Sequence, residues 1–293
     1  MAKRIDLTTR AWSDYELLDS GDNMKLERFG SVIVARPETQ ALWAKVQPEL
    51  WARAAATFSW EGKNGTWKHA SHTPETWPVT WSDMRLNARL TSFKHTGIFP
   101  EQAPNWEWSR EHVEHMRRIT SRAPEILNLF GYTGAASIVA ALAGAHVTHV
   151  DASKQSLTWA RENAESSHVP EGSLRYILDD ALAFAKREAR RGNRYDGIIL
   201  DPPAFGRGAK GEVWHIEQDL PALMKALSEL LSETPGAFFI LNGYAAGYAP
   251  QSFLQLVEDV FPNETPEYGE LVIAEQDGTR VIPAGIYVRF VRQ

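Results

Sequence analysis

The stretch Asn128-Leu129-Phe130-Gly131-Tyr132-Thr133-Gly134 joins a predicted strand, residues 125–130, to a predicted helix, residues 135–143. Two glycines in this turn allow the backbone to approach a ligand closely, and the helix that follows presents free N–H groups. The glycine spacing is G-x-x-G, which does not match the G-x-G-x-x-G pattern that clamps a dinucleotide pyrophosphate. The turn therefore indicates a ligand site without identifying the ligand.

Helices and strands are expected to alternate along the chain from residue 109 onward. This alternation predicts an α/β fold with a parallel sheet that is covered by helices on both faces. The last two strands have no helix between them, so we expect them to form an antiparallel edge. The predicted helices are 109–119 (capped by Ser109), 135–143, 154–165, 181–191, 216–231 and 251–260, and the predicted strands are 125–130, 146–150, 174–178, 195–200, 237–241, 271–275 and 286–291.

The first 95 residues have a different pattern, with short β-like runs such as 31–34 and 85–93 between turn signals. One or two helices are expected within residues 39–56. We therefore predict two domains, a smaller β-rich accessory domain over residues 1–95 and an α/β domain over residues 96–293.

Bulk composition is that of a globular protein, with 293 residues, 43% of them hydrophobic and 23% charged. No stretch reaches the ~20 apolar residues of a membrane span, and no signal peptide is recognisable, so we expect a cytoplasmic protein without membrane contact. The net charge of −6 is unfavourable for a nucleic-acid binder. The basic cluster at Arg117, Arg118 and Arg122 is expected to be solvated, whereas Arg207 and Lys210 lie beside the candidate site and could contact a substrate.

Acidic side chains follow the ends of successive predicted strands. Asp151 ends the second strand, where a carboxylate can bind both hydroxyls of a ribose. Asp179 and Asp180 follow the third strand, where a carboxylate could accept from an adenine amino group. Any one of these side chains could instead cap a helix. The set as a whole favours a ligand that contains a nucleoside.

The fourth strand leads into Asp201-Pro202-Pro203-Ala204-Phe205, which is suited to hold a flat nitrogen-containing group. Asp201 and the Pro202 carbonyl can accept N–H groups, the prolines fix the backbone, and Phe205 offers a face for stacking. The alternative is a rigid turn in which the aspartate caps its own backbone. Asn242 ends the fifth strand and could wall the same pocket, although a simple turn explains it equally well. The catalytic candidates are Asp201, Pro202, Pro203 and Phe205.

These motifs resemble those of class I S-adenosylmethionine-dependent methyltransferases, and more narrowly the bacterial family that methylates bases of large-subunit ribosomal RNA. That family shows Thr-Gly-hydrophobic-Phe, Asn-Leu-Phe-x-Tyr-Thr-Gly and Asp-Pro-Pro-x-Phe, which occur here at residues 96–99, 128–134 and 201–205. The resemblance covers about residues 94–293 and implies a Rossmann-like sheet with S-adenosyl-L-methionine as cofactor. The cofactor-binding residues that it implies are Thr96, Phe99, Asn128, Phe130, Gly131, Tyr132, Thr133, Gly134, Asp151, Ala152, Ser153, Asp179, Asp180, Ala181 and Asp201.

The absence of cysteine restricts the reaction. Some relatives make 5-methylcytosine by attack of a cysteine on the pyrimidine ring, which this chain cannot do. We therefore expect methylation of a guanine or adenine nitrogen in structured RNA. The resemblance implies that this RNA is ribosomal. Two alternatives stay open: a methyltransferase that acts on a protein side chain or a small molecule, which the acidic charge favours, and a non-catalytic RNA-binding or assembly protein with the same fold. His112 and His115 are expected to be packed or solvated, so no metal site is predicted.

Overall fold

The computed structural model describes the chain except residues 63, 71–72, 209–210, 245–246, 277 and 279. It divides into two compact units, which are described separately. Unit 1 comprises Met1–Leu7, Pro104–Leu271 and Ala284–Gln293, and unit 2 comprises Thr8–Ala103 and Val272–Pro283.

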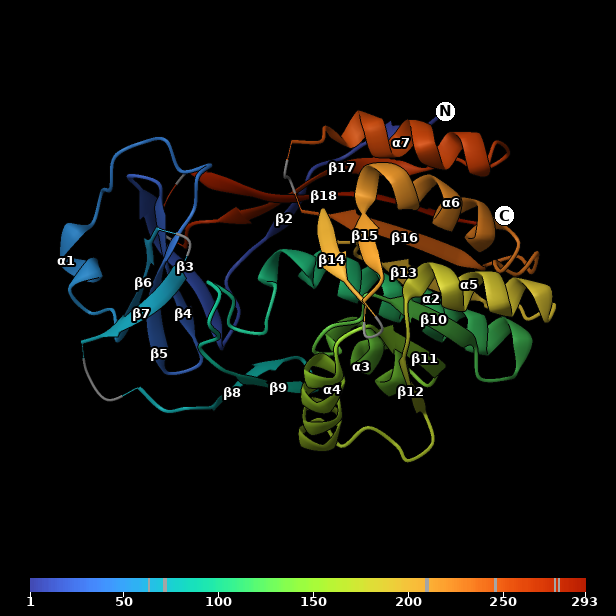
Figure 1. Cartoon of the computed structure of the whole chain (residues 1–293), viewed down its shortest axis with the longest axis horizontal. Helices are drawn as coiled ribbons and strands as arrows, with labels where there is room; N and C mark the ends of the chain where they lie inside the picture. The colour runs from blue at the N-terminus through green and yellow to red at the C-terminus, as the bar shows by residue number, and fades with distance from the viewer. Residues whose placement is uncertain (63, 71–72, 209–210, 245–246, 277, 279) are drawn as a thin grey trace. The chain divides into compact units, whose positions relative to one another are not determined.

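Unit 1 is built on one sheet, in which β2 (Leu7–Thr9) pairs with β17 and the other strands are β1 (Lys3–Arg4), β10 (Glu125–Leu129), β11 (His146–Asp151), β12 (Leu174–Leu178), β13 (Gly197–Leu200), β16 (Phe238–Gly243), β17 (Glu267–Ala274) and β18 (Val281–Val291). Their order is β1-β17-β18-β16-β13-β10-β11-β12 (Figure 1). Neighbouring strands from β16 to β12 run parallel, whereas β18 is antiparallel to β16. The predicted Rossmann-like sheet with an antiparallel strand toward one edge is confirmed.

Helices cover both faces of this sheet, and they are α2 (Ala103–Thr120), α3 (Ala135–Leu142), α4 (Lys154–Ser166), α5 (Ala181–Arg190), α6 (Ile216–Ser228) and α7 (Pro250–Val260). Alternate residues of a strand point to opposite faces. Leu127 and Leu129 of β10 accordingly pack in the cluster that includes apolar residues of α5, α6 and α7. Ile126 packs in the cluster that includes residues of α2 and α3 on the other face. Because both faces are buried, the central strands are apolar almost throughout.

Helix α2 begins six residues before the predicted start. It follows directly on a 3₁₀ turn, η1 (Pro100–Gln102), where proline at the first position suits the start of a helix. Ser109 was predicted to cap this helix, and this prediction is wrong. Its hydroxyl lies inside the helix and donates to the Trp106 carbonyl at 2.9 Å.

The sequence analysis missed a short hairpin between β13 and α6. Strands β14 (Phe205–Arg207) and β15 (Val213–His215) pair antiparallel, with Phe205 opposite His215. The hairpin is anchored by Trp214, which is 5% exposed and donates its indole N–H to the Pro203 carbonyl at 2.7 Å. The Asp-Pro-Pro turn therefore continues into regular structure.

Unit 2 contains a sheet in the order β3-β4-β5-β6-β7 and a separate hairpin, β8-β9. Only β5 and β6 pair in parallel within the sheet. Helix α1 (Pro48–Trp51), one turn long, lies within residues 39–56, where one or two helices were expected. Strand β2 (Leu7–Thr9) crosses from unit 1 to unit 2. The strands of unit 2 are β3 (Tyr15–Gly21), β4 (Met24–Phe29), β5 (Val32–Pro37), β6 (Ala56–Glu61), β7 (Asn64–His69), β8 (Trp77–Trp81) and β9 (Met84–Ala88).

A buried ionic cluster lies inside unit 2. Arg36 donates to both oxygens of Glu27, at 2.7 and 2.9 Å, and the Tyr15 hydroxyl donates to the same carboxylate at 2.9 Å. Burial acts to raise the pKa of Glu27, but Arg36 and Lys25 outweigh it and hold this pKa at about 2. Glu27 is fully buried, so its charge depends on these partners.

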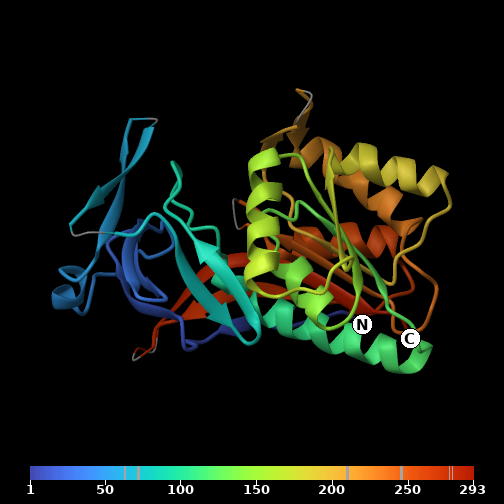
Figure 2. The ribbon, with the colours of Figure 1, turned by 90° about the horizontal axis from the view of Figure 1, so that it is seen from below.

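The units are not continuous in sequence, whereas the predicted boundary at residue 95 assumed that they were. Residues 1–7 belong to unit 1, so both chain ends lie in that unit (Figure 2). The segment 272–283 belongs to unit 2. That each unit is a domain able to fold alone stays a proposal. None of the helices that the structure describes is long and apolar enough to cross a membrane.

Candidate active site

The register of the parallel strands places the predicted acidic and glycine-rich turns at one edge of the sheet. Leu129 pairs with Leu200 on one side and with Val150 on the other, so the turns that begin at Phe130, Asp151 and Asp201 are neighbours. Asp151 in turn pairs with Leu178, which precedes Asp179. The chain leaves β10 toward β11 and returns on its other side as β13, so strand order reverses at β10. Ligands of open α/β sheets bind at such a reversal.

The turn after β10 has a strained backbone. Phe130 and Tyr132 have φ of 56° and 50°, in the left-handed region that aromatic residues rarely adopt. Gly134 has φ of 92° and precedes α3. Gly134 makes no side-chain cap hydrogen bond, and uncapped N–H groups at the start of a helix suit an anionic group. Strain of this kind is concentrated at functional sites.

Asp151 holds this turn from the neighbouring strand. Its carboxylate accepts the backbone N–H of Tyr132 and that of Ser153, both at 2.8 Å. Burial raises the pKa of Asp151, while these two N–H groups oppose the shift. Each carboxylate oxygen keeps a further lone pair, so the side chain can still accept ligand hydroxyls. Ser153 also caps α4, accepting the N–H of Ser156 at 3.2 Å, and Ala152 between them is half-buried.

The two aspartates after β12 have different partners. Asp180 caps α5 by accepting the N–H of Ala183 at 2.8 Å, and Ala181 is the buried first residue of this helix. Asp179 forms an ion pair with Arg187 at 2.7 Å and accepts the N–H of Asp180. Asp180 is therefore a helix cap, whereas Asp179 is paired with an arginine.

The fourth turn presents its aromatic side chain to solvent. Asp201 is half-buried and Pro202 is buried, whereas Pro203 and Phe205 are exposed. The Phe205 side chain is 52% exposed and packs edge-on against the His215 ring, with centroids 5.1 Å apart. Such an aromatic face is free to stack on a planar ligand.

A sequence profile of the S-adenosylmethionine-dependent methyltransferases matches residues 60–260, which is more than half of the chain. The chain belongs to this family. The methyltransferase is similar over its whole length to the S-adenosylmethionine-dependent methyltransferase from Agrobacterium tumefaciens, with a TM-score of 0.94, 38% identity and coverage of 100% of this chain and 96% of that one. S-adenosylmethionine is thus the cofactor of this protein.

Two further similarities are more limited. SMU.776, solved in complex with S-adenosylhomocysteine, is 20% identical with a TM-score of 0.74, covering 95% of this chain and 75% of that one, and shows a likeness of fold. The curated ribosomal RNA large subunit methyltransferase K/L of Hahella chejuensis (strain KCTC 2396) is 34% identical over 160 residues. That alignment covers 54% of this chain and 20% of the relative, so the methyltransferase matches only a fifth of that protein.

The residues at the sheet edge fit the cofactor. A Cβ atom at Gly131 would lie 2.3 Å from Cε1 of His149, so a side chain at position 131 would collide with this residue of β11. The N-terminus of α3 suits the carboxylate of the methionine part, and Asp151 suits the ribose hydroxyls. Thr133 is fixed beside them, because its carbonyl accepts the side-chain amide of Asn163 at 2.9 Å.

Four predicted site residues are buried or packed against other side chains. Asn128 is buried and donates to Ser137 of α3 at 2.8 Å. Asn242 is also buried, and its oxygen accepts from Asn105 at 2.7 Å. Thr96 and Phe99 belong to unit 2, where Thr96 is fully buried and Phe99 packs against His95. Contacts of these residues with cofactor or substrate stay predictions.

Of the two basic candidates for substrate contact, Arg207 lies on the β14-β15 hairpin and can be described, whereas Lys210 cannot. Arg207 is exposed at the end of β14, two residues after Phe205. Lys210 lies outside the described residues. Sequence reasoning missed Trp214 and His149, although Gly206, Gly208 and Gly211 signal a turn before Trp214 and His149 lies between the apolar residues Val147 and Val150 of β11.

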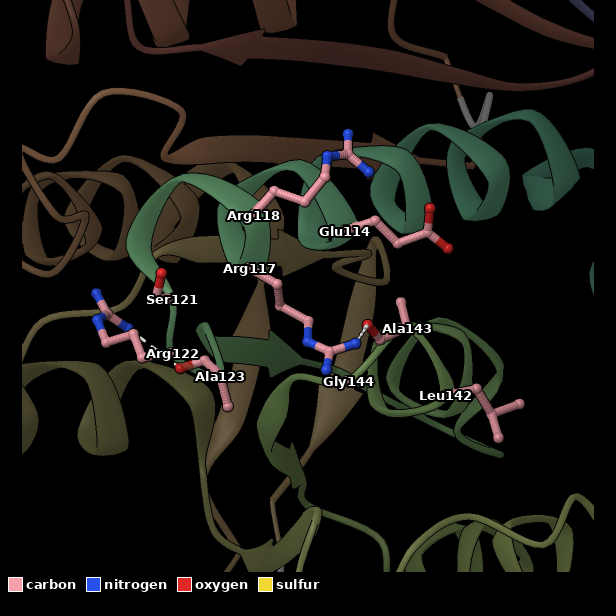
Figure 3. A pocket seen from close by; sticks show the side chains of 9 residues that line it. All are labelled: Glu114, Arg117, Arg118, Ser121, Arg122, Ala123, Leu142, Ala143 and Gly144. Carbon is pink, nitrogen blue, oxygen red and sulfur yellow. Dashed lines mark hydrogen bonds between the residues drawn. The ribbon is translucent and has the colours of Figure 1, made fainter.

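A cavity of about 630 Å³ lies at the opposite end of the strands, where Ala123 precedes β10 and Gly144 precedes β11 (Figure 3). Arg117 and Arg122 border it. Both are exposed, as expected, but each also has a structural partner. Arg117 donates to the Ala143 carbonyl at 3.1 Å, and Arg122 forms a two-point pair with Asp196 at 2.6 and 2.8 Å. The cavity is therefore remote from the cofactor edge.

Proposed function

We propose that the methyltransferase transfers a methyl group to a nitrogen of guanine or adenine in ribosomal RNA. The observation that carries this proposal is the turn from Asp201 to Phe205, which lies beside the cofactor turn and ends in an exposed aromatic ring. The name of the curated relative, a ribosomal RNA large subunit methyltransferase, supports RNA as the substrate class.

The cofactor site is proposed to be formed by the turns at 130–134, 151–153, 179–181 and by Asp201. When bound, S-adenosylmethionine supplies a methyl group on a sulfonium, which carries the reactivity. The protein has to orient the acceptor and exclude water. The Asp151 carboxylate would fix the ribose, and Asp179 or Asp180 would accept from the adenine amino group.

The acceptor side requires little acid–base chemistry. Asp201 and the Pro202 carbonyl would accept the N–H groups of the base, so that the nitrogen lone pair is directed toward the methyl group. Phe205 would stack on the base, an interaction worth about 1–3 kcal/mol per base. The chain has no cysteine, so methylation of carbon 5 of cytosine through a covalent cysteine adduct is excluded.

A methyltransferase that acts on a protein side chain or a small molecule is the second candidate, and the net charge of −6 favours it. The test is incubation of the purified full chain with methyl-labelled S-adenosylmethionine and total RNA from a strain that lacks the gene. We expect label in ribosomal RNA, and methylguanosine or methyladenosine after digestion to nucleosides. RNA from the parent strain, already methylated, is the matched substrate control and should take up little label.

Label that is confined to protein or metabolites would refute RNA as the substrate, and labelled 5-methylcytosine would refute a nitrogen acceptor. The Asp201→Asn variant separates an enzyme from a non-catalytic binding protein. We expect turnover to fall by about 100-fold or more, and by much more than the affinity for S-adenosylhomocysteine, because Asp201 is only one of several proposed cofactor contacts. Equal incorporation by the variant and the parent protein would remove Asp201 from the reaction.

A further inference from the structure

His149 of β11 lies directly beneath the cofactor turn. It is fully buried, and its ring packs edge-on against Tyr176 with centroids 5.5 Å apart. A Cβ atom built at Gly131 would lie 2.3 Å from Cε1 of His149 and 2.5 Å from its Nδ1. Real Cβ atoms do not approach other atoms this closely, so the ring and the glycine backbone are in contact. The ring thus fills the space that any other side chain at position 131 would need.

A hydrogen-bond chain fixes the orientation of this ring. The Asn128 amide donates to Ser137 Oγ at 2.8 Å, and Ser137 Oγ lies 2.9 Å from His149 Nδ1. If the serine hydroxyl accepts from the amide and donates to Nδ1, the ring proton lies on Nε2, which is buried without a hydrogen-bond partner among the described residues. Burial lowers the pKa of His149 to about 4, partly offset by the Tyr132 backbone, so the ring is neutral at pH 7.

The turn above the ring needs support from outside. Its left-handed residues, Phe130 and Tyr132, each hold a conformation that costs about 1–3 kcal/mol. Backbone hydrogen bonds help: Gly131 N–H donates to the Val150 carbonyl at 3.1 Å, and Asp151 accepts the Tyr132 N–H. These bonds attach the turn to β11, and the ring of His149 determines how closely it can settle there.

We propose that His149 is a positioning residue for the cofactor turn: its ring, held by Ser137, is the support on which Gly131 rests, and it keeps Phe130 and Tyr132 in their left-handed conformations. Asn128, which sequence analysis assigned to cofactor contact, acts through Ser137 as the outer end of this support. The inference rests on the proposed placement of the cofactor at residues 130–134.

The proposal predicts that Gly131 and His149 are coupled. Gly131→Ala adds a methyl group where the ring lies, and Gly131 has no left-handed φ, so alanine can adopt its backbone conformation. We expect this variant to lose at least about tenfold in affinity for S-adenosylhomocysteine, because the added methyl group meets the ring and must displace the turn. His149→Ala should also weaken binding, because it removes the support. Adding Gly131→Ala to His149→Ala should cost less than about threefold, because the methyl group then has space.

Isothermal titration calorimetry with S-adenosylhomocysteine on the full chain measures these affinities, and thermal unfolding monitors the fold. Gly197→Ala is the matched control, since its Cβ would lie 2.5 Å from the Phe238 ring in the same sheet. Adding His149→Ala to Gly197→Ala should not restore any affinity or stability that Gly197→Ala has lost. Ser137→Ala adds no atom, and we expect it to weaken binding by about three- to tenfold because the ring loses its fixed orientation.

The outcomes separate this inference from the proposed site. Unchanged affinity in Gly131→Ala would mean that the cofactor does not lie on this turn, and the proposed site would fail. Loss of affinity in Gly131→Ala that is equally large in the His149→Ala background would leave the site in place and overturn the role of His149. If Gly131→Ala does not fold, unchanged affinity in both His149→Ala and Ser137→Ala would also overturn the role of His149.

Discussion

The stability of unit 1 should depend on pH through His149. The unfolded chain takes up a proton on this side chain below its ordinary pKa of 6.5, whereas in the folded protein burial lowers the pKa to about 4. Between these values the unfolded state binds more protons, so the free energy of unfolding falls as pH falls. The loss begins near pH 6.5 and is complete below about pH 4.

The size of the effect follows from the same two values. One pKa unit corresponds to about 1.4 kcal/mol, so a change from pH 7 to pH 5 should lower the free energy of unfolding by about 2 kcal/mol through this residue. The assay is urea unfolding followed by circular dichroism at both pH values, for the parent protein and for His149→Gln. Glutamine is polar but does not titrate, so the variant should lose about 2 kcal/mol less between pH 7 and pH 5.

His95 of unit 2 also has a pKa that burial lowers to about 4, but it is present in both proteins, so its contribution cancels. Equal pH dependence in the parent protein and His149→Gln would refute the reasoning. It would mean that His149 is hydrated or charged in the folded protein, contrary to its complete burial.

Three further perturbations test separate features. Phe205→Ala should leave the melting temperature unchanged, because the ring is 52% exposed, and should raise the KM for RNA about 5- to 150-fold in steady-state kinetics. Arg36→Met should lower the free energy of unfolding by about 3–5 kcal/mol in urea titrations because the buried Glu27 carboxylate loses its two-point ion pair and keeps only Lys25 and Tyr15, whereas Arg28→Met at the more exposed pair with Glu16 should cost less than about 1 kcal/mol. Asn163→Ala should cost about 1–3 kcal/mol, measured in the same way, because the Thr133 carbonyl loses its donor.

The parallel sheet was predictable because local patterns determine it. The apolar runs at 126–129, 197–200 and 238–241 lie between helices with polar outer faces, and buried parallel strands require such runs. The end of each strand could be located from the aspartate or glycine that follows it. The order of the turns along the sheet edge does not follow from these local patterns, because right-handed crossovers restrict the topology without selecting one strand order.

Features that depend on distant contacts were not predictable. Glu27 and Arg36 occur in strands of unit 2 where charged residues indicate a solvent-facing side, and only their pairing shows that they are buried. Hairpin β14-β15 is too short for a periodic signal, and Trp214 anchors it by packing in the core and by donating to the Pro203 carbonyl. His149 carries no motif, and its contact with Gly131 arises between two strands.

The arrangement of β17 and β18 has a consequence for biosynthesis. Strand β18 lies between β16 and β17, and Arg280, which follows β17, donates to Asp19 of β3 in unit 2. Neither unit has its full set of contacts until residues 280–291 have left the ribosome, long after the cofactor turns have been synthesised. At about 5–20 residues per second, the chain spends several seconds with the edge of β16 uncovered. During that interval the uncovered edge of β16 is accessible to a chaperone.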